Sequence, residues 1–290
     1  MRGFQIILNF IISLIGIILV SGLPVLLSGI NKNEIYIDAY WKTVQDIIYA
    51  IFHPSELTYV IIGGHKERDL FPYLWDPIAY SLTVLFSSFL CAITLAILFT
   101  IVSMLFSEKV RIRIKLFFYI FESLPDILII LSVQFALLFY YKKSGILLFE
   151  IVSTYEEKAY VLPILILAIL PAVQLFRVSI LSFESESKKN YVLLAKSIGL
   201  GKLFILTVHI LRNAIISVFF QSKKTVWFML SNLLVIELLF NIPGITRFLL
   251  STFQPNLFTL AILSIFIPLF LFYNLGEYVL SKKANRGEDL

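Results

Sequence analysis

The sequence predicts an all-α polytopic membrane protein with six transmembrane helices. Of its 290 residues, 59% are hydrophobic and only 15% are charged, and the mean hydropathy is +0.91. A helix needs about 20 mostly apolar residues to cross a bilayer, and six such runs are present. We expect a single transmembrane domain over residues 1–290, with spans near 4–27, 78–106, 116–141, 159–183, 214–240 and 257–280.

The first run carries no charge between Arg2 and Lys32. It is longer than the apolar part of a cleavable signal peptide, so we expect a retained helix. The outside loop 31–76 that follows leans acidic. Apolar residues recur at helical spacing from Trp41 to Ile51, which indicates either an amphipathic helix on the membrane surface or an ordinary packed loop helix.

The next three runs differ in where they carry charge. The second ends in the basic segment SEKVRIRIK, which is typical of a cytoplasmic loop. The third contains Glu122, Pro125 and Asp126 near its start, and the proline is expected to bend the helix. The fourth holds a lone charge, Arg177. These charges fit either a position at the membrane interface or a direct role in transport.

The fifth run is interrupted by Lys223 and Lys224 and contains Glu237 near its end. A charge at mid-bilayer costs roughly 2.5 to 3.5 kcal/mol on insertion scales. The lysines therefore either reach the inner headgroups or line a translocation pathway that attracts an acidic substrate. Glu237 is a candidate for pairing with Arg247 or with a partner chain, or for substrate contact.

The distribution of basic residues predicts the orientation. With both termini cytoplasmic, the inside segments carry 13 of the 24 lysines and arginines and the outside loops carry 8, as the positive-inside rule requires. We expect a multi-pass protein of the cell membrane. The single cysteine, Cys91, excludes an internal disulfide. The chain also lacks a Gly-rich phosphate loop, so a nucleotide-binding domain has no support. We expect no cofactor, metal or nucleic-acid site in it.

The inside loop 184–213 has the most informative pattern. Tyr191, Ala195 and Gly199 lie four residues apart on one helix face, where small side chains permit close approach of another surface. Gly199 and Gly201 are expected to end this helix in a left-handed turn.

A second helix is then expected from Lys202 through His209 to Asn213 and on into the fifth span. The spacing alone fits either a helix hairpin or a docking site for a soluble partner. His209 has no second ligand on its side of the membrane, so we expect it to pack or to make a polar contact rather than to bind a metal.

This loop contains, in order, Asn190-Tyr191-Val192, Ala195, Gly199-Leu200 and His209-Ile210-Leu211-Arg212-Asn213. The order resembles the coupling signature of the permease subunits of ABC importers, in the oligopeptide, dipeptide and nickel branch. Three further segments resemble other parts of these permeases, in the same order along the chain. They are LWDPIAYSLTVLF, FESLPDILIIL and IELLFNIPGITRFLL.

The resemblance implies a type I ABC importer permease fold with cytoplasmic coupling helices between the fourth and fifth spans. It implies a second permease subunit, two ATP-binding subunits that bind ATP and magnesium, an extracellular solute-binding protein, and peptides or peptide-like solutes as cargo. The residues it implies for ATPase coupling are Asn190, Tyr191, Ala195, Gly199, Leu200, His209, Arg212 and Asn213. Candidates for the translocation pathway are Lys223, Lys224 and Glu237.

Four departures from the family pattern are visible. The family usually has an acidic residue where Asn190 stands and a lysine or arginine where Ile198 stands. The outside loop is shorter than usual, and Lys223 and Lys224 occupy a span that is generally apolar. The first two departures predict a less charged ATPase contact or weaker coupling. Two other functions remain open: an ion-gradient-driven transporter or channel, and a non-transporting membrane scaffold.

Overall fold

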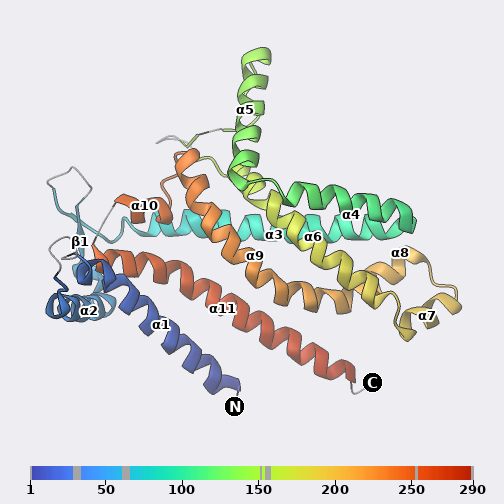
Figure 1. Ribbon diagram of the computed structural model, residues 1–290, viewed down its shortest axis with the longest axis horizontal. Coiled ribbons are helices and arrows are strands. Elements are labelled where there is room, and N and C mark those ends of the chain that lie inside the picture. Colours follow the sequence, from blue (N-terminus) through green and yellow to red (C-terminus); the bar gives the residue numbers. More distant parts are fainter. Residues whose placement is uncertain are drawn as a thin grey trace. The chain divides into compact units, whose positions relative to one another are not determined.

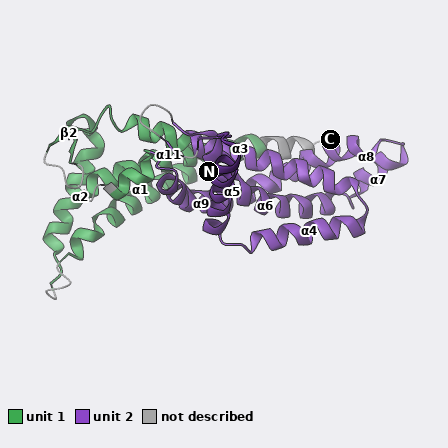
Figure 2. Ribbon diagram, turned by 90° about the horizontal axis from the view of Figure 1, so that it is seen from above, with its two compact units in different colours: residues 1–82, 243–290 green, residues 83–242 purple. Residues whose placement is uncertain are grey.

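The computed structural model describes residues 2–28, 34–60, 66–150, 152–153, 158–251 and 254–288. They form two compact units, one made of residues 1–82 and 243–290 and the other of residues 83–242 (Figure 2). In the described residues, six helices are long and apolar enough to cross a membrane: Gly3–Leu26, Trp75–Leu105, Asp126–Ser144, Val161–Glu186, Lys202–Leu239 and Pro255–Leu280. The predicted all-α fold with six spans is confirmed.

The first unit is built around helices α1 (Arg2–Leu26), α2 (Ile37–Phe52) and α11 (Pro255–Glu288), which pack against one another. The 3₁₀ turn η2 (Pro54–Glu56) follows α2, and α10 (Ile245–Ser251) packs against α11. The short strands β1 (Thr58–Tyr59) and β2 (Arg68–Asp69) pair antiparallel, with Thr58 opposite Asp69. This small pairing is the only strand structure in the described residues.

Helix α2 packs against α1 through one of its faces. Val44 and Ile47 form a buried cluster with Ile18 of α1, and the Tyr40 hydroxyl donates to the Leu19 carbonyl at 3.2 Å. Trp41 and Ile48, beside this packed face, stay exposed. Helix α2 therefore packs against α1 through one face and leaves other apolar residues exposed, so the packed and membrane-surface interpretations both stay predictions.

The contact between α1 and α2 depends on Gly22, and replacing it by valine is expected to separate these helices. A Cβ on Gly22 would lie 2.9 Å from Cε2 of Tyr40, and overpacking of this kind costs about 1–3 kcal/mol. The thermal unfolding midpoint of the purified protein should fall. Gly16→Val is the matched control, because a Cβ there meets nothing within 4 Å; equal midpoints for the two variants would contradict the packing role.

The second unit is centred on α6 (Val161–Glu186), which packs against α9 (Leu211–Leu239). The later part of α3 (Trp75–Leu105), α4 (Glu108–Glu122) and α5 (Asp126–Ser144) belong to the same unit. Along the chain, α6 is connected to α9 through α7 (Asn190–Ser197), α8 (Lys202–Phe204) and the π-helical segment η3 (Ile205–Ile210). Figure 1 shows α7 and α8 at the end of α6.

The predicted third span, 116–141, is wrong at its start. The structure breaks this run into α4 and α5, with Pro125 extended between them at φ −61° and ψ 136°. Proline has no amide hydrogen to donate and its ring obstructs a preceding helical turn, so the chain breaks here instead of bending. The apolar residues from Leu116 to Phe121 and the following Glu122 continue the helix that begins in the basic segment, and the next candidate membrane span starts at Asp126.

Candidate functional site: the hairpin between α6 and α9

The hairpin, residues Asn190–Asn213, turns at Gly199. This glycine has φ +83°, and the Leu200 amide donates back to the Ala195 carbonyl at 3.1 Å, as in a left-handed helix C-cap. The predicted left-handed turn is confirmed for Gly199 and wrong for Gly201. Gly201 has φ −65° and starts α8, where its carbonyl accepts from the Ile205 amide at 3.0 Å.

The second arm continues into the fifth span as predicted. The candidate span Lys202–Leu239 has 38 residues, well beyond the roughly 20 that a bilayer requires. The first residues of this span can therefore project from the membrane while they remain helically continuous with α9. The π-helical segment inside it, which includes His209, gave no signal in the sequence.

A hydrogen-bond chain ties the first arm to α9. The Tyr191 hydroxyl donates to Glu186 Oε2 at 2.6 Å and accepts from Asn213 Nδ2 at 3.1 Å. Partial burial, followed by the bond to Glu186, raises the pKa of Tyr191 to about 12, so the phenol remains a donor at neutral pH. Lys189 adds a salt bridge to Glu186 at 2.6 Å. Tyr191 and Asn213 thus have bonds that hold the hairpin together.

The remaining predicted coupling residues fall into inward and outward groups. Ala195 is buried, Leu200 and His209 are half-buried, and Asn190, Gly199 and Arg212 are exposed. The His209 ring lies edge-on to Phe204 with centroids 5.7 Å apart, which is a packing contact. Among the described residues there is no group of three or more His, Cys, Asp or Glu side chains that could hold a metal ion.

The hairpin carries a set of exposed apolar side chains, which we call the apolar ridge. Ile198 is 67% exposed and Leu194 is 63% exposed. The other members of the ridge are Leu193, Leu203, Phe204 and Val208. Exposed apolar patches of this kind mark interaction surfaces. The sequence revealed the missing charges at Asn190 and Ile198, and the structure adds that these apolar side chains are exposed.

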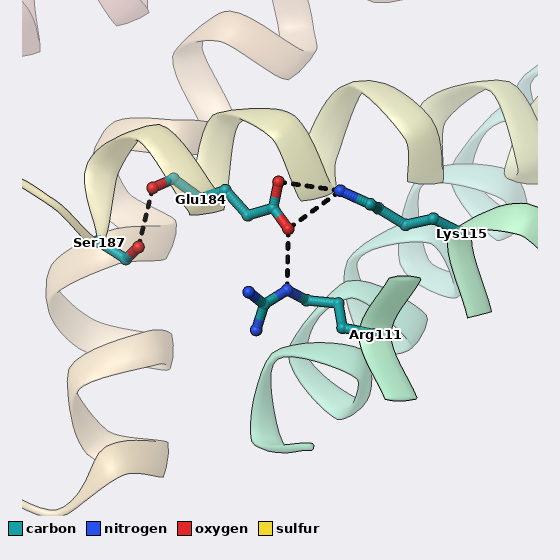
Figure 3. A network of polar contacts seen from close by, with 4 residues as sticks. All are labelled: Arg111, Lys115, Glu184 and Ser187. Atoms are coloured by element: carbon teal, nitrogen blue, oxygen red, sulfur yellow. Dashed lines mark hydrogen bonds and ion pairs between the residues drawn. The ribbon is translucent and has the colours of Figure 1, made fainter. Parts of the chain in front are cut away.

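An ion-pair network joins the base of the hairpin to α4. Glu184, near the end of α6, accepts from Arg111 Nε at 2.8 Å and from Lys115 Nζ at 3.1 Å (Figure 3). Its own carbonyl accepts from the Ser187 hydroxyl at 2.8 Å. These side chains are half-buried, so water screens their charges less than at an open surface. The sequence did not indicate a role for Glu184, because its contacts depend on how α4 is aligned against α6.

A second pair lies about two helical turns further along the same two helices. Arg177 Nη1 of α6 is 3.2 Å from Glu122 Oε1 of α4, with the charges in the opposite order. Arg177 is therefore not an isolated charge, because its guanidinium has an acidic neighbour. Together the two contacts fix the register of the antiparallel helices.

The candidate pathway residues all lie on α9. Lys223 is half-buried, Lys224 is exposed, and Glu237 is 1% exposed. The Glu237 carbonyl accepts from the Ile242 amide at 2.8 Å, which closes the end of α9. The structure adds a polar contact that the sequence did not indicate, in which Asn232 Nδ2 of α9 donates to Asp126 Oδ2 of α5 at 2.8 Å. The pairing of Glu237 with Arg247 stays a prediction.

Six candidate membrane spans, with a hairpin between the fourth and fifth, indicate an integral membrane protein. The family model for the binding-protein-dependent transport system inner membrane component matches residues 88–286. The chain belongs to this family, the permease subunits of ABC importers. No curated protein matches the chain.

Proposed function

We propose that this chain is the membrane-spanning permease subunit of an ATP-driven importer and that its hairpin receives an ATPase subunit. The apolar ridge is the observation that carries the proposal. Its side chains are exposed on and directly after α7, on α8 and on η3, and the Tyr191–Asn213 bond joins α7 to α9. A soluble partner seated on the ridge would bury apolar area worth about 25 cal/mol per Å².

The hairpin can transmit force because its parts are fixed to one another. The Gly199 turn sets the angle of α7, the Tyr191–Asn213 bond ties α7 to α9, and α9 packs along α6. Closure of an ATPase pair around ATP and magnesium would move this rigid body and shift the spans between inward-open and outward-open states. This chain hydrolyses nothing; its partners bind the nucleotide.

The complete importer would contain a second permease subunit, two ATPase subunits and an extracellular solute-binding protein. The positive-inside distribution supports a cytoplasmic hairpin and cytoplasmic termini. Resemblance to the oligopeptide branch supports peptides or peptide-like solutes as cargo. Lys223, Lys224 and Glu237 remain candidates for the pathway that the cargo follows.

Reconstitution tests this proposal. We expect the chain, assembled in proteoliposomes with its second permease, ATPases and binding protein, to take up a labelled peptide only when ATP is present. Uptake by the chain alone under an ion gradient would instead establish a secondary transporter. ATP-dependent uptake that persists without this chain would make it a scaffold.

The apolar character of the contact gives a separate prediction. Ile198→Ala should weaken ATPase binding by up to about sixtyfold, because it removes three methyl or methylene groups worth about 0.8 kcal/mol each when fully buried in the contact. Binding of the purified ATPase to the permease in nanodiscs measures the effect. Leu181→Ala is the control, since Leu181 is also exposed but lies on α6 outside the hairpin. Equal affinities for the two variants would exclude the ridge as the contact.

A further inference from the structure

In the second unit, α7 and η3 of the hairpin line a cavity of about 450 Å³ together with the ends of α3 and α6 and with α4. It lies on the side of α7 that carries Val192 and Lys196, whereas the ridge residues Leu194 and Ile198 lie on the other side. It is therefore distinct from the proposed ATPase contact. Its volume is within the range of small-molecule sites, about 300–1,000 Å³.

The cavity is lined by apolar side chains and by three basic side chains. The apolar part is Met104, Val192, Leu200, Ile205, Leu206 and Ile210. Arg111, Lys196 and Lys202 supply positive charge, Ser187 supplies a hydroxyl, and no carboxylate is among the described lining residues. This composition complements a molecule that has an anionic head and an apolar body.

The cations are positioned to bind an anion. The Nε atom of Arg111 donates to the Glu184 carboxylate. The two terminal nitrogens of Arg111 point away from that carboxylate (Figure 3). Lys202 Nζ donates to the Leu105 carbonyl at 2.9 Å, which holds it at the end of the apolar helix α3. An ammonium group has three donors, so this bond leaves capacity for a ligand.

The position of Lys202 distinguishes between sources of the anion. Leu105 is the last residue of a candidate membrane span, so the cavity lies where the hydrocarbon region gives way to headgroups. Basic pockets between membrane helices on the cytoplasmic side are suited to lipid phosphates. A soluble anion would gain nothing from the apolar wall.

We propose that this cavity binds an anionic phospholipid of the inner leaflet, with its phosphate near Arg111, Lys196 and Lys202 and an acyl chain against the apolar wall. The lipid would fill the space beneath α7 and support the hairpin from behind. The inner-leaflet assignment rests on the proposed orientation, whereas binding itself requires no ATPase partner.

Native mass spectrometry of the purified full chain, titrated with dioleoylphosphatidylglycerol, tests the proposal. We expect this lipid to bind about tenfold more tightly than dioleoylphosphatidylcholine. The double variant Lys196→Gln/Lys202→Gln should lose that preference. The matched variant Lys109→Gln/Lys188→Gln removes two exposed lysines outside the lining and should keep it.

Equal affinity of the two lipids, or equal loss in the two double variants, would overturn the proposal. Displacement of the lipid by millimolar inorganic phosphate would assign the cavity to a soluble anion and overturn the lipid assignment. If the Lys202 change prevents folding, Lys196→Gln alone carries the test. Uptake is measured separately, so failure of lipid binding is distinguishable from failure of the proposed transport function.

Discussion

Replacement of Gly199 by valine is expected to abolish ATP-dependent uptake while the chain still inserts into the membrane. Gly199 has φ +83°, where a residue with a Cβ is strained by about 1–2 kcal/mol and a β-branched residue by more. A 1.4 kcal/mol penalty already changes a population tenfold. The hairpin would lose the turn that aims α7, and ATP hydrolysis would no longer drive transport.

Two control variants test whether Gly199 is needed for its positive φ or only for its lack of a side chain. Gly199→Asn should keep most of the uptake, because asparagine tolerates the left-handed conformation. Gly201→Ala should be neutral, because Gly201 has φ −65° and a Cβ there meets nothing within 4 Å. For all three variants, the rates of transport and of ATP hydrolysis are measured in proteoliposomes. Normal coupled uptake by Gly199→Val would rule out the turn as a coupling element.

Glu184→Gln is expected to produce the largest loss of stability in the second unit. The change leaves Arg111 and Lys115, half-buried against α6, without their shared carboxylate. Loss of one partner from a buried pair costs 3–5 kcal/mol and an exposed pair gives less than about 1 kcal/mol. For these half-buried groups we expect about 1–3 kcal/mol, measured as a lower thermal unfolding midpoint.

Glu108→Gln provides the matched comparison for this experiment. The substitution Glu108→Gln also removes one negative charge, but the Glu108 side chain on α4 is exposed. It should leave the midpoint nearly unchanged, because exposed charges contribute little. If the two variants unfold at the same temperature, the network in Figure 3 does not hold α4 against α6.

The sequence predicted the features that depend on local chemistry. Runs of apolar residues located six spans, and Gly199 located the left-handed turn because a glycine after a short helix favours it. Pro125 gave a partial signal. It predicted a bend, but the structure separates two helices there, since the choice between bending and breaking depends on packing beyond the local residues.

Features that depend on tertiary register were not predictable from the sequence. Glu184 is one of two acids near the end of α6, and only the alignment of α4 with α6 brings it to Arg111 and Lys115. The ridge and the cavity likewise require the orientation of α7. Its period places Leu194 and Ile198 on one face, and the contact with η3 determines which face is covered.

Site-directed cross-linking tests the central claim, that the hairpin receives the ATPase. In a Cys91→Ser background, Ile198→Cys in the assembled complex should form a disulfide with a cysteine on the ATPase surface, and its yield should change when ATP is added. Ser144→Cys, at the end of α5, should form none. A complex that transports normally but shows no cross-link from position 198 in any nucleotide state would contradict the account.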